Sequence, residues 1–473
     1  MKKNLCLLAV ICAISFVAQT VRSLASVFDH GDLKVSPNHR FLMYADGTPF
    51  FYLGDTAWEL FHRLTLQESE RYLDDRAGKR FNVIQAVVLA EFDGLHTPNA
   101  DGDLPLVDDD PTKPNEAYFK HVDAVVDMAR ERGLFIGMLP TWGDKVTKAW
   151  GLGPVIFEAS NARKYGLFLG RRYRDRPNII WILGGDRDAT DSVAVWSAMA
   201  EGLREGDGGR HLITYHPSGE RSSSQWFQDA SWLDFNLMQS GHGRKDGSNF
   251  KMIEKDYQLT PVKPTIDGEH RYENHPVNWE PEHFGWFDDY DARQASYWAV
   301  FAGAAGDTYG CNDIWQMKTP ERKPLSLARG VWTESLNLPG AGQMQYLLRL
   351  MESRPYFSRV PDQMLIVDDP PEGPDHLQGT RGDGYAFVYF PQGKPAVINT
   401  DAVQGNKLQA WWYNPRNGEA TSIGVFKREM TRTFNPPGAY GRGNDWVLVL
   451  DDARRRFGRP GADVNMSKDK YSR

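Results

Sequence analysis

The sequence predicts an α/β protein in which a (β/α)8 TIM barrel precedes a smaller antiparallel β-sandwich domain. Eight apolar runs bounded by turn residues recur between positions 50 and 309, and eight strands are the number that closes such a barrel. Helical patterns separate these runs, and the alternation of strand and helix favours a parallel sheet. After position 384 short strand-like runs follow one another with turns between them, as in a sandwich.

The barrel prediction rests on its strands, one clear helix and one loop. The expected strands cover residues 50–53, 81–89, 134–139, 178–183, 211–215, 233–238, 264–266 and 304–309. Between Phe119 and Ala129 apolar residues recur at helical spacing, and Gly133 ends this helix just before the third strand. An open doubly wound sheet also alternates, but residues 53–58 (LGDTAW) replace the glycine-rich phosphate loop that such a sheet carries after its first strand.

The chain divides into four segments. Residues 1–25 read as an export signal, because the cations Lys2 and Lys3 precede an apolar run of about 14 residues and the small residue Ala25. That run is short for a membrane span of about 20 residues, so we expect an exported protein, periplasmic or secreted. The barrel is expected over 26–351, the sandwich over 352–453, and a flexible basic tail over 454–473.

Composition restricts the partners. Removal of the signal, with Lys2, Lys3 and Arg22, changes the formal net charge from −7 to −10, which disfavours nucleic acid and anionic membranes as partners. The sequence has 15 tryptophans, and Trp58, Trp142 and Trp315 lie just after expected strands, where aromatic faces suit carbohydrate rings. Only Cys311 remains after the signal, so we expect a packed thiol and no intrachain disulfide. No close histidine spacing indicates a metal, and no cofactor is expected.

Two acids, 83 residues apart, each follow an expected strand. Asp186 ends the string Gly-Gly-Asp after the fourth strand, and Glu269 ends Asp-Gly-Glu after the seventh. Catalytic groups of such barrels stand at the carboxyl ends of the strands, so both acids should face one mouth. A retaining glycosidase needs two carboxyls about 5 to 5.5 Å apart. The alternative is that either acid caps a helix or pairs with its neighbour Arg187 or Arg271.

Further polar and aromatic residues lie at or just beyond the expected strand ends. The candidate substrate contacts are Asp55, Trp58, Gln85, Glu91, Trp142, His216, Gln239, His242 and Trp315. Aromatic rings stack on sugar faces, while acids and amides accept hydroxyl hydrogen bonds. Glu91 and Asp93 are rivals of Asp186 for the acid role, and His216 or His242 could instead be structural.

The motifs resemble glycoside hydrolase family 140, the apiosidase-like barrels fused to a sandwich of collagen-binding type. The similar strings are LGDTAW (53–58), GGD (184–186), KPTIDGE (263–269), YGCNDIWQM (309–317), AWWYNPR (410–416) and GNDWVLV (443–449). The resemblance implies that Asp186 is the acid/base and Glu269 the nucleophile, acting on apiose linkages of rhamnogalacturonan II. In the broader clan Asn-Glu usually stands at the strand-four position, where this chain has the shorter Asp186.

Two other functions remain open from the sequence. The same two carboxylates would serve a mannanase-like or arabinofuranosidase-like enzyme, since one barrel scaffold hosts many chemistries. A non-catalytic carbohydrate- or matrix-binding protein is a third class, and the intact acid pair argues against it. In the sandwich, adjacent Trp411 and Trp412 should point to opposite faces of a strand, so at least one belongs to the core. We therefore expect the sandwich to be a structural domain docked on the barrel.

Overall fold

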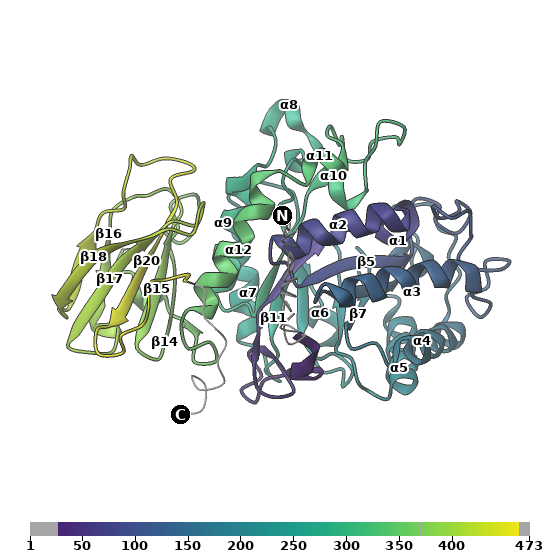
Figure 1. Cartoon of the computed structure of the whole chain (residues 1–473), viewed down its shortest axis with the longest axis horizontal. Helices are drawn as coiled ribbons and strands as arrows, with labels where there is room; N and C mark the ends of the chain where they lie inside the picture. Colours follow the sequence, from purple (N-terminus) through teal and green to yellow (C-terminus); the bar gives the residue numbers. More distant parts are fainter. Residues whose placement is uncertain (1–26, 369, 463–473) are drawn as a thin grey trace, which may run out of the picture.

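The computed structural model describes residues 27–368 and 370–462 and has two parts side by side (Figure 1). The barrel occupies one end of the molecule and the sandwich the other, with helices α9 (Asp289–Phe301) and α12 (Pro339–Glu352) between them. The expected export signal and the last residues of the basic tail lie outside the described residues.

Each of the eight expected barrel runs overlaps a parallel strand, and the predicted fold class is confirmed. In chain order the strands are β4 (Tyr52–Thr56), β5 (Val83–Leu89), β6 (Phe135–Thr141), β7 (Ile179–Gly184), β8 (Ile213–His216), β10 (Asn236–Gln239), β11 (Thr265–Glu269) and β12 (Gly306–Tyr309). Pairing runs from β8 back to β4, then through β12 and β11 to β10. The Thr214 hydroxyl donates to the Phe235 carbonyl at 2.6 Å and links β8 to the chain entering β10, where the barrel closes.

Helices cover the outside of the barrel, as the alternation predicts. The longer ones are α2 (Leu66–Gly78), α3 (Glu116–Glu131), α4 (Ala159–Tyr173), α5 (Val193–Asp207), α7 (Asn249–Tyr257), α9 and α12. Short helices or turns are η1 (Val27–His30), α1 (Leu60–Arg63), η2 (Gly143–Lys145), α6 (Ser224–Phe227), η3 (Val277–Trp279), α8 (Pro281–Phe284), α10 (Asn312–Trp315) and α11 (Trp332–Ser335). The predicted apolar face of α3 is buried from Phe119 to Ala129, because it packs against the strands.

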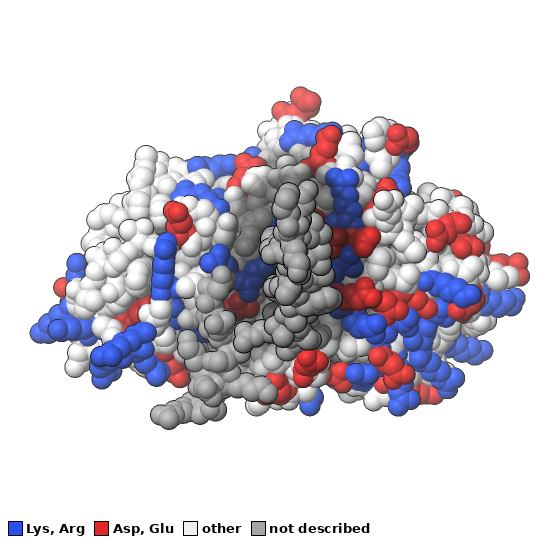
Figure 2. Space-filling model, viewed as in Figure 1, with Lys and Arg blue, Asp and Glu red and all other residues white. Residues whose placement is uncertain are grey.

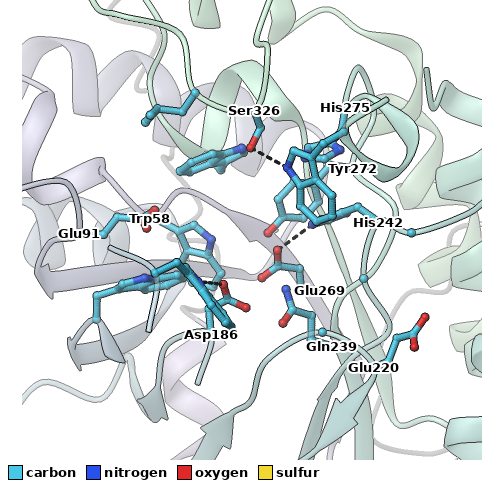
Figure 3. A pocket seen from close by; sticks show the side chains of 18 of the residues that line it. Trp58, Glu91, Asp186, Glu220, Gln239, His242, Glu269, Tyr272, His275 and Ser326 are labelled. Atoms are coloured by element: carbon cyan, nitrogen blue, oxygen red, sulfur yellow. Dashed lines mark hydrogen bonds and ion pairs between the residues drawn. The ribbon is translucent and has the colours of Figure 1, made fainter. Parts of the chain in front are cut away.

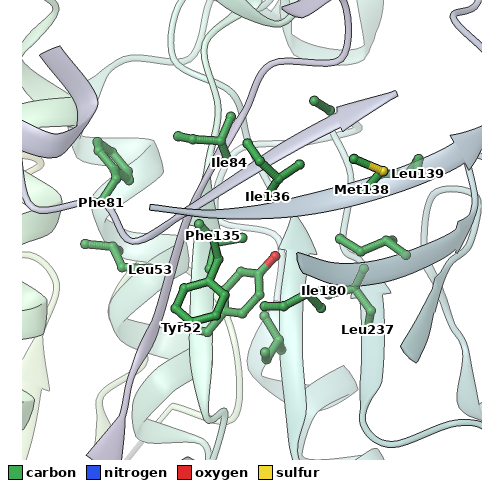
Figure 4. Packing of buried hydrophobic residues seen from close by; sticks show 14 of the residues in the cluster. Tyr52, Leu53, Phe81, Ile84, Phe135, Ile136, Met138, Leu139, Ile180 and Leu237 are labelled. Atoms are coloured by element: carbon green, nitrogen blue, oxygen red, sulfur yellow. The ribbon is translucent and has the colours of Figure 1, made fainter. Parts of the chain in front are cut away.

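Small strands extend the barrel at two places. A three-stranded antiparallel sheet, β1 (Leu33–Val35), β2 (Leu42–Tyr44) and β3 (Pro49–Phe50), precedes the first barrel strand. The short β9 (Arg221–Ser222) pairs antiparallel with β10. Tyr52, Ile84 and Ile136 are fully buried in the barrel core (Figure 4), and inside the barrel the side chains of Gln85 and Ile182 fill the space beside Gly137. This filled interior leaves the strand ends as the place for a site.

The C-terminal domain is an antiparallel sandwich. Its larger sheet has the order β13 (Val360–Pro361), β14 (Gln378–Gly382), β15 (Tyr385–Phe390), β20 (Trp446–Asp452), β17 (Lys407–Tyr413) and β18 (Ala420–Lys427). The smaller pairs β16 (Ala396–Asn399) with β19 (Thr431–Phe434), and the turns η4 (Gln363–Leu365) and η5 (Thr400–Ala402) complete the domain. The expected division of the two tryptophans is confirmed: Trp412 belongs to the sandwich core, and Trp411 packs against the core that continues into the barrel.

The surface and the sequence composition agree in having mixed charge. On the face of the barrel in Figure 2, Lys and Arg lie among Asp and Glu. Among the described residues, no helix is both long enough and apolar enough to cross a membrane. Cys311 is a fully buried free thiol.

Candidate active site

A cavity of about 630 Å³ opens at the carboxyl ends of the barrel strands (Figure 3). Its polar lining includes Asp186 and Glu269, so the two acids do face one mouth, as the strand numbers predict. The other lining side chains include Trp58, Glu91, Phe92, Trp142, Trp150, Glu220, Gln239, His242, Tyr272, His275, Trp279, Trp315, Leu325 and Ser326.

Two consecutive glycines bring Asp186 into this cavity. Strand β7 ends at Gly184, and Gly184, Gly185 and Asp186 all have positive φ, of 90°, 101° and 60°. A Cβ on Gly185 would lie 2.9 Å from the backbone nitrogen of Gly143 and 2.9 Å from the ring of Trp142. Only glycine allows this turn to pack so closely, and the turn projects the next side chain over the strand ends.

Glu269 is the last residue of β11, which continues three residues beyond the end of the expected strand 264–266. His242 Nε2 lies 2.9 Å from Glu269 Oε1, and His216 Nε2 lies 3.0 Å from Oε2. The histidines come from the end of β8 and from the loop after β10, so two neighbouring strands support this carboxylate. His275 stacks on His242 with ring centroids 4.4 Å apart.

The pKa values of the two carboxyls are shifted in opposite directions. Burial and the charge of Glu269 raise the pKa of Asp186, and together they outweigh the lowering effects of His216 and of a hydrogen bond from Trp150. Burial also acts to raise the pKa of Glu269, but the hydrogen bonds and charges of His216 and His242 outweigh it and hold this pKa well below its usual range. The site therefore favours a protonated Asp186 beside an ionised Glu269.

Neither acid has the structural role that the sequence left open. The Arg187 guanidinium donates to the carbonyls of Thr147, Trp150 and Asp186, and Arg271 donates to Gln294. Within 27–368 and 370–462, no ion pair joins either acid to an arginine, and neither acid caps a helix.

Six of the nine predicted substrate contacts line the cavity. These are Trp58, Glu91, Trp142, Gln239, His242 and Trp315. Trp58 and Trp142 pack with ring centroids 5.4 Å apart, and both are almost fully buried. Together with Trp315 they give part of the cavity lining an aromatic surface.

The other three predicted contacts do not line the cavity. Asp55 lies inside β4, which continues three residues further than expected, and its carboxylate pairs with Arg76 at 2.6 Å and accepts from Tyr72. Gln85 donates to the Thr308 hydroxyl at 2.8 Å inside the barrel. Other barrel residues bind the polar groups of Asp55 and Gln85. The prediction that these two residues contact substrate is therefore replaced by a structural role. His216 is fully buried and reaches the cavity through Glu269.

The two other candidates for the acid, Asp93 and Glu91, differ in whether they line the cavity. Asp93 lies outside the cavity lining, and its carboxylate pairs with His96 at 2.6 Å. Glu91 lines the cavity and is 8% exposed. Burial and the charges of Glu59 and Asp186 raise the pKa of Glu91 well above its usual value. A second neutral carboxyl therefore faces the same cavity as Asp186.

Sequence reasoning missed five aromatic residues of the lining: Phe92, Trp150, Tyr272, His275 and Trp279. Trp150 and Trp279 are 53% and 52% exposed, which is unusual for tryptophan and marks the rim of the cavity. Each lies in an irregular loop or short turn beyond a strand, and the only available signal was an aromatic residue after a strand end. Among the described residues, no cluster of three or more His, Cys, Asp or Glu has a metal-binding arrangement.

Comparisons with known proteins identify both domains. The family described as "Apiosidase-like, catalytic domain" matches residues 36–358, and "Putative collagen-binding domain of a collagenase" matches residues 360–451. A solved structure described as a glycoside hydrolase is 36% identical, with 90% of this chain and 98% of that chain covered and a TM-score of 0.85. A family 5 glycoside hydrolase from Bacteroides vulgatus is 35% identical, with 92% and 96% covered and a TM-score of 0.86. No curated protein matches the sequence.

The fold is shared with these relatives, which are described as glycoside hydrolases, and two carboxyls stand at the mouth of its barrel; the protein is a glycoside hydrolase. Within that class, the chain belongs to the apiosidase-like family, and its second domain belongs to the collagen-binding type that the sequence motifs indicated.

Proposed function

We propose that this glycoside hydrolase cleaves apiosyl linkages in the plant pectic polysaccharide rhamnogalacturonan II, with retention of anomeric configuration. One observation carries the mechanism: two carboxyls of the same cavity, Asp186 and Glu269, have pKa values shifted in opposite directions. A retaining enzyme needs this division, because one group must give a proton while the other attacks as an anion. Membership of the apiosidase-like family supports the choice of sugar.

In the proposed reaction, Glu269 attacks the anomeric carbon and forms a covalent glycosyl ester. Asp186 gives its proton to the glycosidic oxygen, which leaves as an alcohol. Asp186, now ionised, takes a proton from water, and this water attacks the anomeric carbon from the face that the leaving group occupied, displaces Glu269 and restores the original configuration. The contacts of His216 and His242 with its two oxygens keep Glu269 ionised before the attack and stabilise it as a leaving group afterwards.

We also propose that the protein acts outside the cytoplasm, in the periplasm or after secretion. The support is the N-terminal sequence, in which two lysines, an apolar run and small residues follow in the order of an export signal. Mass spectrometry of the N-terminus of protein recovered from the periplasm and medium tests this, with cleavage near Ser26 expected. A chain that keeps residues 1–25 in the cytoplasm would exclude it.

The sugar specificity is tested on a panel of substrates. We expect release from apiosides of pectic side chains and little release from mannan or arabinan oligosaccharides. The cavity lining is compatible with several sugars, since stacking rings and carboxylates recognise hydroxyl patterns in general. Preferential hydrolysis of mannosides or arabinofuranosides would overturn the apiosyl assignment and retain the class.

Azide separates the two catalytic roles. Glu269→Ala should abolish turnover of all substrates, because no covalent intermediate forms. Asp186→Ala should slow natural linkages by about 10² to 10⁴, the scale of general acid catalysis. Aryl glycosides with good leaving groups still form the intermediate in Asp186→Ala, and azide should speed its breakdown and give a glycosyl azide of retained configuration. Inverted azide product, or rescue of Glu269→Ala instead, would overturn the assignment.

A further inference from the structure

The indole of Trp150 occupies an unusual place beside the proposed acid. Trp150 belongs to the irregular segment between η2 and α4, beyond the end of β6. It lines the cavity and is 53% exposed. A large apolar ring is normally buried, and an exposed one at the rim of a sugar-sized cavity indicates a contact surface.

Trp150 also contacts the acid directly. Its indole N–H donates to Oδ2 of Asp186 at 2.9 Å, one of the interactions drawn in Figure 3. In the described part of the chain, no other side chain donates a hydrogen bond to this carboxyl. An indole nitrogen only donates, so Oδ2 must act as the acceptor in this contact. A proton on Asp186 is then directed to Oδ1.

The residue after the acid fixes the indole in place. Arg187 donates from Nε to the Thr147 carbonyl at 3.0 Å and from Nη2 to the Trp150 carbonyl. Its guanidinium carbon lies 4.5 Å from the centroid of the Trp150 ring. The Arg187 side chain thus bonds to the first and last carbonyls of residues 147–150. It also packs on the Trp150 ring, where a cation over an indole is favourable. Further along, Asp144 Oδ2 accepts from the Gly153 N–H at 3.0 Å.

We propose that Trp150 is a positioning residue that orients the Asp186 carboxyl through its N–H and packs its open ring face against the leaving-group sugar. This proposal rests on the proposed function, because it takes Asp186 as the acid. The acid must touch the glycosidic oxygen, and the ring that touches the acid therefore borders the sugar that departs. The same side chain then links recognition of the leaving group to proton donation.

Loss of the indole N–H has a defined effect on pH dependence. The charged and titratable groups around Asp186 are Glu269, His216, Arg187, Glu91, Tyr215 and Tyr272. The Trp150 hydrogen bond lowers the pKa of Asp186 against burial and Glu269, which both raise it. Removing that bond raises this pKa further. Since the acid must be protonated to act, the basic limb of the pH profile then moves to higher pH.

The kinetic test compares three variants. Trp150→Phe keeps a ring and removes the N–H, and we expect kcat on natural glycosides to fall about tenfold, as for a lost hydrogen bond to a charged group. Activated aryl glycosides, which need no proton, should lose less than about threefold, and the basic limb should move to higher pH. Trp150→Ala should also raise KM for natural substrates. The matched control is Trp226→Phe, which removes an indole hydrogen bond to Thr190 outside the cavity.

Two results would overturn the proposal: a Trp150→Phe variant that behaves like Trp226→Phe, or an equal loss on both kinds of substrate with an unmoved basic limb.

A measurement that needs no turnover distinguishes failure of this proposal from failure of the proposed function. In protein labelled with ¹⁵N-tryptophan, the indole resonance absent from Trp150→Phe is that of Trp150. The chemical shift of this resonance should change with pH as Asp186 titrates, and the change should disappear in Asp186→Asn. If the protein cleaves no glycoside but this titration is seen, the contact stands and the proposed function fails. An indole resonance that does not titrate overturns the contact.

Discussion

Arg293 and Asp445 form a buried two-point ion pair between the two domains. Arg293 Nε lies 2.9 Å from Asp445 Oδ2, and Nη2 lies 2.8 Å from Oδ1. Arg293 belongs to α9 of the barrel, while Asp445 directly precedes β20 of the sandwich. Both side chains are at most 1% exposed. Around the pair, Tyr297 stacks on Tyr389 with ring centroids 5.0 Å apart, so the domains share one continuous core.

Breaking this pair should destabilise the whole protein. Asp445→Ala leaves the Arg293 guanidinium buried and, among the described residues, paired with Asp289 alone, and loss of one partner of a buried pair costs about 3 kcal/mol or more. Calorimetry should show a lower transition temperature. The control is Glu429→Ala, which removes an exposed pair with Arg432 and should change the free energy of unfolding by at most about 1 kcal/mol. Equal effects of the two variants would contradict an energetic role for the interface pair.

Removal of the sandwich should be more severe. A chain of residues 26–351 exposes the faces of Tyr297 and Phe301, which now pack on Tyr389 and Phe387. Exposed aromatic faces of this kind promote aggregation. We expect an insoluble or unstable barrel, checked by size-exclusion chromatography and thermal melting. A soluble, fully active barrel would show that the sandwich has another role, to be sought in binding of the isolated domain to pectin or collagen.

The two histidines beside Glu269 should control the acidic limb of the pH profile. His242→Gln retains an amide donor near Oε1 and removes the charge that helps lower the pKa of Glu269. That pKa should rise, and because Glu269 must be ionised to attack, the acidic limb of kcat/KM should move to higher pH. Exposed His283 provides a control, and His283→Gln should leave the limb in place. An unmoved limb in His242→Gln would show that His242 does not set the ionisation of Glu269.

Much of the barrel could be predicted because its strands are short, continuous apolar runs. Residues 178–183 and 264–266 identify β7 and β11, and the acids that follow them then fall at one mouth by the symmetry of the barrel. The sandwich followed in the same way from short runs such as 385–389, which lies within β15. These strands depend on the local sequence, so a single amino-acid sequence predicts them.

The partners of the acids could not be predicted, since they depend on contacts distant in sequence. His242 meets Glu269 across 27 residues, and Trp150 meets Asp186 across 36. The segment that carries Trp150 is irregular, so no period in the sequence gives its direction. Asp55 was placed at the mouth because an apolar run ending at Leu53 hides the true end of β4 at Thr56. A polar residue that continues a buried strand is indistinguishable from one that follows it until its partner Arg76 is known.

Glu273 should make the free energy of unfolding depend on pH. It is 3% exposed and accepts from the Tyr309 hydroxyl at 2.6 Å and from the Gly340 N–H at 3.0 Å. Burial raises the pKa of Glu273 from 4.5 to about 7, although these two hydrogen bonds act to lower it. The folded state therefore binds this proton more tightly than the unfolded state. Its contribution to stability is full below about pH 4.5 and is lost as pH rises towards 7, by about 3 kcal/mol at most.

Glu273→Gln should remove that dependence. The amide is neutral at every pH and still accepts a hydrogen bond, so the variant should lose less stability than the natural chain between pH 5 and about 8. Denaturant unfolding at several pH values measures the difference. The exposed Glu131→Gln serves as control and should follow the natural chain. A Glu273→Gln variant with the same slope of unfolding free energy against pH would show that Glu273 does not titrate in this range.

Glu91 and Asp186 present the sharpest choice in the cavity, because burial raises the pKa of both. If Asp186 is the acid, Asp186→Asn should slow natural linkages by about 10² to 10⁴ and remove the basic limb of the pH profile while the fold persists. Glu91→Gln should then keep both limbs and slow natural and activated substrates alike, as expected for a residue that only contacts the sugar. Near-ultraviolet circular dichroism of both variants checks the fold. A missing basic limb in Glu91→Gln, with both limbs kept in Asp186→Asn, would transfer the acid role to Glu91. The argument for Asp186 is its position, since the turn at Gly184 and Gly185 places it directly beside Glu269, whose charge is the second largest cause of its raised pKa.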